Sequence, residues 1–273
     1  MPKVSVITTV FNGENYFDRA IPSILDQTYS DFEFLIADDG SVDSTKEKLK
    51  DVETRDKRIR VFRPGRLGFA RALNYLLERA QGRYIVRQDF DDISFPTRLE
   101  RQVAFLDDHP EVGLVGAYCV VEDERRGEKY TRMPPTDHEG ICRAMSKYIP
   151  VAHTLVALRK TAIEEAGGFV EADNIVDLRT WINVGAAGWR FANIPEALGI
   201  HYIYQESFWH RNFTYKYRQR DLAAVQRQAI RRLHLPAWMQ IYPLGRCIYP
   251  SLPDGLKRAV RRFVAGSKER DIG

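Results

Sequence analysis

Apolar residues in the first part of the chain follow two alternating patterns. Short, nearly continuous apolar runs are typical of strands buried on both faces of a sheet, and they occupy residues 4–9, 32–37, 59–62, 84–86 and 112–121. The segments between them are predicted to be helices from their apolar spacing and capping residues, at residues 16–27, 44–52, 69–80 and 96–108. This alternation predicts an α/β fold with a mostly parallel central sheet flanked by helices.

Beyond residue 121 the pattern is less regular. A charged stretch at residues 122–129 predicts a hairpin or a loop. Short helices are expected at 141–148, 161–166 and 177–187, short strands at 153–158, 190–192 and 198–203, and a long helix at 213–233. These changes divide the chain into residues 1–121, 122–212 and 213–273.

Charge is distributed unevenly along the 273 residues. The whole chain carries a formal net charge of +4, but the part from Thr214 onward has 13 Lys and Arg against 4 Asp and Glu. That part therefore carries +9, and the preceding part carries −5. An acidic body with a basic, helical C-terminal extension predicts an anionic partner for the extension.

Cysteine usage and hydropathy indicate the compartment. The three scattered cysteines are an odd number without metal-type spacing, which argues against a disulfide framework. No apolar stretch approaches the roughly 20 residues needed to span a bilayer, and residues 4–7 are predicted to form a strand rather than a signal peptide. We therefore expect a reduced, cytoplasmic protein.

The residues directly after the first predicted strand disfavour several classes of nucleotide-binding protein. Residues 11–14 lack the G-x-G-x-x-G fingerprint of dinucleotide binding. A nucleotidyltransferase is a further functional alternative. It would have a glycine-rich loop with a basic residue here, and residues 11–14 do not supply one. The basic residues form no recognised nucleic-acid motif, so no nucleic-acid partner is expected.

A cluster of carboxylates comes directly after the strand predicted at residues 84–86. Asp89, Asp91 and Asp92 stand within four positions, and such like charges repel one another unless a cation lies between them. Ligands of α/β sheets bind beyond the carboxyl ends of the strands, and carboxylates there suit a hard divalent cation that also holds phosphate oxygens. Asp89 and Asp91 are thus a candidate metal–diphosphate site; the alternative is a solvated acidic turn.

Several motifs in the first 120 residues, taken in order, closely resemble the family 2 glycosyltransferases, the inverting nucleotide-sugar enzymes with the GT-A fold. They comprise residues 4–12, 23–29, 38–45, Gly68 with 72–74, 82–85, 89–92, Pro96, 98–99 and Gln102. The opening also looks like the spore-coat-type members, which favours a uridine or thymidine donor. The resemblance implies that residues 1–121 bind the nucleotide sugar and residues 122–212 the acceptor.

The resemblance places the nucleotide at the ends of the first strands. Thr9 and Phe11 end the first strand, where an aromatic ring can stack on a base; alternatively Phe11 belongs to the core. Asp39 is similar to the family acid that accepts a hydrogen bond from a pyrimidine N–H, and Asp38 beside it can hold a turn. Arg66 falls where the family contacts phosphate or base, or it is a solvated loop arginine.

By the same resemblance, Asp91 is the direct ligand of Mn²⁺ or Mg²⁺, which would neutralise the leaving diphosphate. Asp89 lies against the ribose or in the water shell of the metal. Asp92 is expected to make a structural bond or to cap the next segment.

The family's catalytic base is the Asp of a Glu-Asp pair before a tryptophan-containing helix. The match at residues 188–196 sets this register, and it places the base at Asp177 and the tryptophan at Trp181. Glu171 and Asp173 are weaker alternatives. His153 is predicted to begin a strand that faces the acceptor, where it is either functional or a satisfied structural residue.

The chain departs from the family pattern on the acceptor side. Val176 replaces the Glu of the pair, and Arg179 occupies a usually acidic position. Tyr202 and Tyr204 stand for the family's Arg and His, with His201 and His210 nearby. These departures leave open a second hypothesis, a nucleotide-binding scaffold that has lost turnover.

The C-terminal extension combines aromatic residues and prolines with a basic stretch at residues 256–264. A basic amphipathic segment lies on an anionic membrane rather than through it; the alternatives are a solvated helix packed on the domain and an oligomer contact. We therefore expect a metal-dependent inverting glycosyltransferase that uses a nucleoside diphosphate sugar as donor, and we expect that donor to be a UDP-sugar. The acceptor would be a hydroxyl of a polysaccharide or lipid-linked glycan, at the cytoplasmic membrane face.

Overall fold

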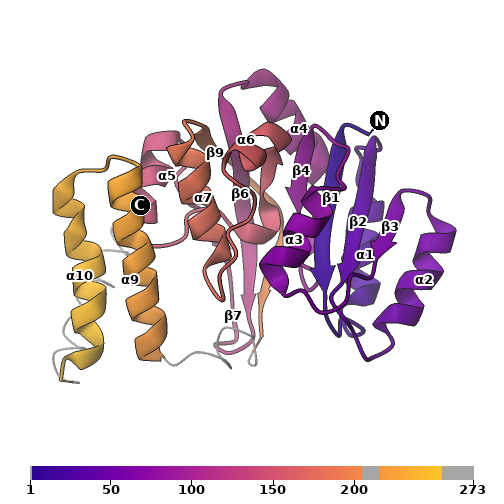
Figure 1. Cartoon of the computed structure of the whole chain (residues 1–273), viewed down its shortest axis with the longest axis horizontal. Helices are drawn as coiled ribbons and strands as arrows, with labels where there is room; N and C mark the ends of the chain where they lie inside the picture. The colour runs from indigo at the N-terminus through magenta and orange to yellow at the C-terminus, as the bar shows by residue number, and fades with distance from the viewer. Residues whose placement is uncertain (1, 205–214, 254–273) are drawn as a thin grey trace.

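The computed structural model describes residues 2–204 and 215–253, and the described strands form one sheet (Figure 1). The strand order is β3-β2-β1-β4-β8-β6-β9-β5, with β7 paired to β6. The first four strands are parallel, as predicted: β1 (Val4–Val10), β2 (Phe32–Asp38), β3 (Ile59–Phe62) and β4 (Tyr84–Arg87). The connecting helices are α1 (Phe17–Leu25), α2 (Thr45–Arg55) and α3 (Phe69–Leu77), and α4 (Arg98–Asp108) follows β5.

The second part of the sheet is mixed rather than parallel. Its strands are β5 (Ile93–Ser94), β6 (Val112–Asp123), β7 (Glu128–Arg132), β8 (Ala157–Arg159) and β9 (Arg190–Ile203). β8 runs antiparallel to both β4 and β6. β5 pairs antiparallel with β9, β7 pairs antiparallel with β6, and β6 pairs with β9 in parallel. The prediction of a mostly parallel sheet thus describes β1 to β4 but not the whole sheet.

The two strands expected at 190–192 and 198–203 are one strand, β9. The β6–β9 register jumps from Ala117 opposite Ile194 to Tyr118 opposite Ala197. Pro195 and Glu196 therefore stand outside the ladder, as expected for a proline, which has no N–H to donate. The sequence pattern predicts a break where the structure has a bulge.

The helices of the second part are α5 (His138–Met145), α6 (Lys160–Glu165) and α7 (Val176–Ala186). Asp137 caps α5 by accepting the N–H of Gly140 at 2.8 Å. The strand predicted at 153–158 is wrong in its first part, because His153–Leu155 form a 3₁₀ turn before β8 begins. The charged stretch after β6 is a hairpin closed by β7, one of the two predicted alternatives.

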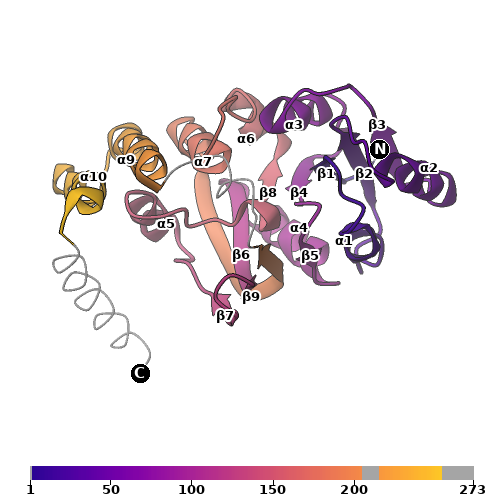
Figure 2. The same cartoon turned by 90° about the horizontal axis from the view of Figure 1, so that it is seen from below.

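The described part of the C-terminal extension, residues 215–253, is a helical hairpin that packs on helices of the second part. It contains α9 (Tyr215–Arg232), the 3₁₀ turn η2 (Ala237–Gln240), α10 (Ile241–Ile248) and the turn η3 (Tyr249–Ser251). α9 packs on α7 and α5, and α10 packs on the outer side of α9 (Figure 2). No helix in the described part of the chain is long and apolar enough to cross a membrane. His210 and residues 256–264 lie outside the described residues.

Two apolar layers hold the sheet between its helices. Successive side chains of a strand point to opposite faces, so Ile7, Leu35 and Ile85 share one face while their neighbours face the other. The first layer packs under α3, α6 and α7, with Trp181 fully buried, and the second packs under α1 and α4. Burial on both faces fixes the parallel strands in register, so that their carboxyl ends lie along one edge of the sheet.

Candidate functional site

The loops after β1, β2 and β4 meet at this edge. Gly13, just after β1, packs so closely on the loop after β4 that a Cβ at this position would lie 2.8 Å from the Phe90 ring. Asn12 has a φ of 54°, donates its N–H to Ser41 Oγ at 2.9 Å, and accepts the N–H of Val42 through its side chain at 2.9 Å. The turns after β1 and β2 are thus tied together, and Thr9 lies half-buried at the end of β1.

Asp39 anchors the loop that carries Arg66. Its Oδ1 accepts the backbone N–H groups of Leu67 at 2.6 Å and Gly68 at 3.1 Å, and Arg66 Nη1 lies 3.2 Å from its Oδ2. Arg66 also lies over the Phe11 ring, 3.6 Å from its centroid. Arg66 is therefore not a freely solvated arginine, and the anchored loop brings a guanidinium and an aromatic ring together.

Phe11 is 46% exposed, so it does not belong to the core. Asp38 is buried, and its Oδ1 accepts the N–H of Ser41 at 2.8 Å, which confirms the expectation that it holds a turn. The two adjacent acids therefore differ in function: Asp38 shapes the loop after β2, whereas Asp39 binds a neighbouring loop.

The three acids after β4 have different partners. Asp89 forms an ion pair with the buried Arg87. Asp92 is buried and accepts from His201 Nδ1 at 2.9 Å and from the N–H of Tyr202 at 2.8 Å, which confirms the expected structural bond. Asp91 is half-buried, and its carboxylate has no hydrogen bond or ion pair to another residue within residues 2–204 and 215–253.

These partners set the charge of each group. Burial raises the pKa of Asp91 to about 7, and the neighbouring Asp92 and Asp89 add to the effect. Burial also opposes ionisation of Asp89, but the Arg87 guanidinium outweighs it and holds the pKa of Asp89 below its usual value. Burial likewise opposes the charge of His201, but Asp92 outweighs it and raises the pKa of His201 to about 9. Asp91 is thus the member of the cluster that lacks a compensating cation.

Arg98 supports the loop after β4 that carries Asp89, Asp91 and Asp92. It is fully buried and donates to the carbonyl oxygen of Arg87 at 2.8 Å, to Gln88 Oε1 at 2.8 Å and to Ser94 Oγ at 2.8 Å. Burial, reinforced by the charge of Arg87, lowers the pKa of Arg98 to about 9. The sequence indicated Arg98 only as part of a motif, and its role as a structural hub emerges from contacts that span β4, β5 and α4.

A second arginine holds the backbone of Asp91. Arg19 on α1 donates to the Asp91 carbonyl oxygen at 3.1 Å, and the Tyr204 hydroxyl donates to the same oxygen at 3.2 Å. The Arg19 guanidinium also lies 4.3 Å from the centroid of the Tyr202 ring. The two tyrosines that depart from the family pattern thus pack with Arg19 around the candidate metal ligand. Sequence reasoning missed Arg19 and Arg87; an arginine at the end of an apolar strand was the available signal for Arg87.

Asp177 lies in the first turn of α7, half-buried, and accepts the N–H of Leu178 at 2.8 Å. Burial raises its pKa; the Leu178 N–H and Arg132 act against this, and the charge of Asp89 adds to it. Asp177 is thus close enough to Asp89 and Arg87 to be influenced electrostatically by both. Direct contacts also join the loop after β4 to α7: the N–H of Asp89 donates to Thr154 Oγ1 at 3.2 Å, and the ring of the adjacent His153 lies 5.6 Å from that of Trp181.

The other acceptor-side candidates, His153 and Glu171, make contacts typical of structural residues. His153 lies among aromatic rings, with its centroid 5.4 Å from Phe69, 6.2 Å from Phe169 and 5.6 Å from Trp181. Burial, with the charge of Arg87, lowers the pKa of His153 to about 3, so the ring is neutral. Glu171 forms an exposed ion pair with Arg71 at 2.8 Å.

The departures at positions 176 and 179 have a structural explanation in part. Arg179 Nη2 donates to Asp221 Oδ1 on α9 at 3.0 Å, and its Nε donates to the Asn174 carbonyl at 3.3 Å. Val176 is buried in the apolar layer next to Asp177. The arginine thus links α7 to the C-terminal extension.

The residues present fit a divalent cation only in part. Within the described residues no three His, Cys, Asp or Glu side chains converge on one point. Asp91, which is unpaired, and the adjacent Asp89 nevertheless fit a cation such as Mg²⁺ that takes most of its ligands from water and phosphate oxygens. Asp91 and Asp89 are the side chains that would hold it.

Known proteins of similar sequence are named as glycosyltransferases. The model of the family "Glycosyl transferase family 2" matches residues 5–167. The "Putative glycosyltransferase EpsE" of Bacillus subtilis (strain 168) is 36% identical over 278 residues, which cover 98% of this chain and 96% of that protein. The "Amylovoran biosynthesis glycosyltransferase AmsE" of Erwinia amylovora is 32% identical over 200 residues, covering 71% and 74% of the two chains.

Solved structures share the fold. The mannosyltransferase PcManGT from Pyrobaculum calidifontis, in complex with GDP-Man and Mn²⁺, has a TM-score of 0.67 at 20% identity, over 97% of this chain and 80% of its own. S. aureus TarS 1-349 in complex with UDP-GlcNAc has a TM-score of 0.67 at 19% identity, over 90% and 70%. With a family model over more than half its length and a relative aligned almost end to end, this chain belongs to glycosyl transferase family 2 and is a glycosyltransferase with the GT-A fold.

Proposed function

We propose that this enzyme moves a sugar from a nucleoside diphosphate sugar, UDP-linked in our proposal, to an acceptor hydroxyl with inversion at the anomeric carbon. The donor side comprises β1 to β4 with the loops that follow them, and the acceptor side comprises β6 to β9 with α7. The single observation that carries the proposal is the junction of the two sides: the N–H of Asp89 donates to Thr154 Oγ1 at 3.2 Å, and the adjacent His153 ring lies 5.6 Å from the ring of Trp181 on α7, the helix that begins with Asp177 in its first turn. The neighbours in complex with GDP-Man and UDP-GlcNAc support a donor of this class.

On the donor side, Phe11, Arg66 and Asp39 would hold the nucleotide. The Phe11 ring is exposed and has Arg66 over it, so a base can stack on this pair. Asp39 fixes the loop of Arg66 and would accept a hydrogen bond from a base N–H in addition to those that it already accepts. Thr9, half-buried at the end of β1, would border the nucleotide there.

At the diphosphate, Asp91 would bind the cation directly, with Asp89 beside it. Bound Mn²⁺ or Mg²⁺ supplies positive charge for the diphosphate as it leaves. Arg87 keeps Asp89 ionised, and Arg19 and Tyr204 fix the backbone of Asp91 through its carbonyl oxygen.

On the acceptor side, Asp177 would act as general base. Its carboxylate takes the proton of the acceptor hydroxyl, and the oxygen attacks the anomeric carbon while the bond to the diphosphate breaks on the opposite face. The electron pair of that bond leaves with the diphosphate, so a single displacement inverts the configuration. A raised pKa makes Asp177 a stronger proton acceptor than an ordinary aspartate.

We place the acceptor in a growing glycan, polysaccharide or lipid-linked. The relative AmsE is named for amylovoran biosynthesis, and TuaG of Bacillus subtilis (strain 168), 29% identical over 212 residues, is named for teichuronic acid biosynthesis. We further propose a cytoplasmic enzyme at the membrane face, with residues 213–273 as a separate basic extension.

The test is a thermal-shift panel of nucleotides and nucleotide sugars with Mn²⁺ or Mg²⁺, followed by NMR of the sugar released or transferred. We expect a uridine nucleotide to raise the melting temperature in the presence of metal, and the first-formed anomer to be inverted. A retained anomer would contradict the mechanism. Metal-dependent nucleotide binding without any hydrolysis or transfer would favour the scaffold hypothesis instead.

A further inference from the structure

An exposed apolar surface runs along the last described helix. Trp238, Ile241, Leu244 and Ile248 are 62%, 63%, 51% and 49% exposed. Their spacing places them on one side of η2 and α10. We define this surface as the α10 face.

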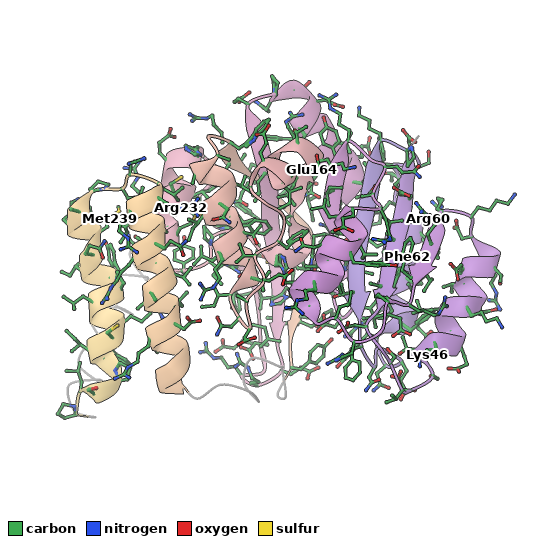
Figure 3. All side chains as sticks on the ribbon, viewed as in Figure 1. Lys46, Arg60, Phe62, Glu164, Arg232 and Met239 are labelled. Atoms are coloured by element: carbon green, nitrogen blue, oxygen red, sulfur yellow. The ribbon has the colours of Figure 1, made fainter. Side chains whose placement is uncertain are left out.

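The α10 face cannot turn inward, because the opposite side of the helix is fixed to the rest of the enzyme. Met239 and Pro243 are buried, and Met239 is labelled at the start of the hairpin's second arm in Figure 3. Arg246 donates to Gln219 Oε1 at 2.5 Å, to Gln226 Oε1 at 3.2 Å and to the Lys147 carbonyl at 2.8 Å. The apolar side chains are thus held outward by contacts to α9 and to the loop after α5.

The position of the α10 face is compatible with catalysis. Among the described helices α10 is the outermost at its end of the molecule, and α9 lies between it and the sheet (Figure 2). A surface bound to the α10 face therefore leaves the strand ends at the candidate site open.

Aromatic and cationic groups accompany the apolar residues. The rings of Trp238 and Tyr242 are 6.1 Å apart, and Lys147 Nζ lies 4.6 Å from the centroid of the Tyr242 ring. Tryptophan, tyrosine and lysine at the border of an apolar surface suit the headgroup region of a bilayer.

The charge of this part of the chain selects between a lipid and a second copy. From Thr214 onward the net charge is +9, and residues 254–273 contribute six Lys and Arg against three Asp and Glu. Two copies paired through the α10 face would bring like charges together, whereas an anionic bilayer attracts them.

We propose that the α10 face is a docking surface for an anionic lipid bilayer, in which Trp238, Ile241, Leu244 and Ile248 enter the headgroup region. The purpose of the docking rests on the proposed function, because it would bring the enzyme to a lipid-linked acceptor. The docking itself can be measured without any substrate.

The experiment is sedimentation of the full chain with vesicles of phosphatidylcholine and phosphatidylglycerol in equal parts, and with vesicles of phosphatidylcholine alone. We expect binding to the anionic vesicles, and at least ~10-fold weaker partition of the double variant Ile241→Glu, Leu244→Glu, because two apolar side chains lose their burial in lipid. The matched control is Met133→Glu, which changes a 68% exposed apolar residue on the chain after β7 and should partition like the wild type.

Folding of each variant is checked by its melting temperature and by the shift that UDP with Mn²⁺ produces. Equal partition of wild type and double variant would overturn the proposal. So would a wild type that ignores vesicles but forms a dimer in sedimentation velocity that the double variant loses, because the α10 face would then be a self-contact. Failure to bind any nucleotide would contradict the proposed function and leave the partition result valid.

Discussion

The donor side and the acceptor side position their acidic residues by different means. On the donor side, backbone groups of nearby turns fix the acids: Asp39 accepts two N–H groups of the loop before α3. On the acceptor side, groups from distant elements gather around α7: Arg132 comes from β7 and Asp221 from α9. Turn geometry is encoded in contiguous motifs, whereas the acceptor side depends on tertiary contacts and can change one residue at a time.

Charge compensation distinguishes one acid on each side from the others. Asp39, Asp89 and Asp92 each have a cationic partner, which are Arg66, Arg87 and His201 respectively. Asp91 and Asp177 have no ion pair within the described residues, and burial raises the pKa of both. A buried carboxylate without a counter-charge is costly and marks a functional candidate. The two uncompensated acids, one on each side, are therefore those to which we assign the metal and the proton.

The largest effect is expected from Asp177→Asn. The amide keeps the shape of the side chain but cannot accept the proton of the acceptor hydroxyl, so transfer should fall about 10²–10⁴-fold. Binding of UDP with Mn²⁺, measured by calorimetry, should be unchanged because Asp177 lies on the acceptor side. Asp173→Asn, which changes the weaker alternative at an exposed position nearby, should leave transfer unchanged if Asp177 is the base. Full transfer by the Asp177 variant would move the base to another residue.

The next effect is expected from Asp91→Ala. Loss of the direct ligand should weaken Mn²⁺-dependent binding of UDP at least ~10-fold, with little change in the weak binding measured in EDTA. Titration calorimetry with and without Mn²⁺ separates the two. Asp51→Asn on α2, whose carboxylate pairs with Arg55, serves as control. A variant that gains as much affinity from Mn²⁺ as the wild type would show that Asp91 does not bind the metal.

The donor side could be largely predicted from the sequence because its determinants are local. The buried strands, the turn held by Asp38 and the structural bond of Asp92 follow from short motifs whose spacing fixes the chain direction. The partner of Asp92 could not be predicted, because His201 lies 109 residues away. The same holds for Arg98, which reaches the Val156 carbonyl 58 residues away at 3.3 Å.

The acceptor side could be predicted only where a long match set the register. That match placed the candidate base at Asp177; the local pattern predicted a helix at 177–187, and α7 is found at Val176–Ala186. The continuity of β9 across Pro195 was missed, because a proline ends a strand in most contexts but here occupies a bulge. The tie between Arg179 and Asp221 was also missed, because nothing local indicates which helix packs on α7.

A smaller effect is expected from Arg66→Ala, which tests the nucleotide pocket. Removing the guanidinium over Phe11 should cost roughly 0.5–2 kcal/mol of binding free energy for UDP, which is a loss of about 2–30-fold. Arg63→Ala, three residues earlier and paired with Glu53 at 3.6 Å, is the matched control. The affinity is measured by calorimetry at saturating Mn²⁺. Equal affinities of the two variants would assign the base contact elsewhere.

The pH dependence of transfer distinguishes Asp177 from other bases. The base works when ionised, so kcat/KM is lost as the pH falls through its pKa, and a raised pKa starts that loss at a higher pH than for an ordinary aspartate. Arg132 lowers the pKa of Asp177, so Arg132→Met should move the acidic limb to still higher pH, while Arg132→Lys should restore it. An acidic limb that stays in place in the Met variant would show that Arg132 does not lower the pKa of Asp177.

The smallest effect tests whether the acceptor side is held by the C-terminal extension. The side chains of Arg179 and Asp221 are 25% and 20% exposed, so their ion pair at 3.0 Å is partly screened by solvent. A double-mutant cycle of Arg179→Gln and Asp221→Asn, read by urea unfolding, should give a coupling free energy of about 0.3–1 kcal/mol. Arg71 and Glu171 form an exposed pair at 2.8 Å and provide the control cycle, with a smaller coupling.

Because Arg179 stands two residues after Asp177, kcat should fall slightly in both single variants if α9 also orients the base. A coupling of zero would mean that the arginine at this position does not tie α7 to the extension, and the departure from the family pattern would then need another cause.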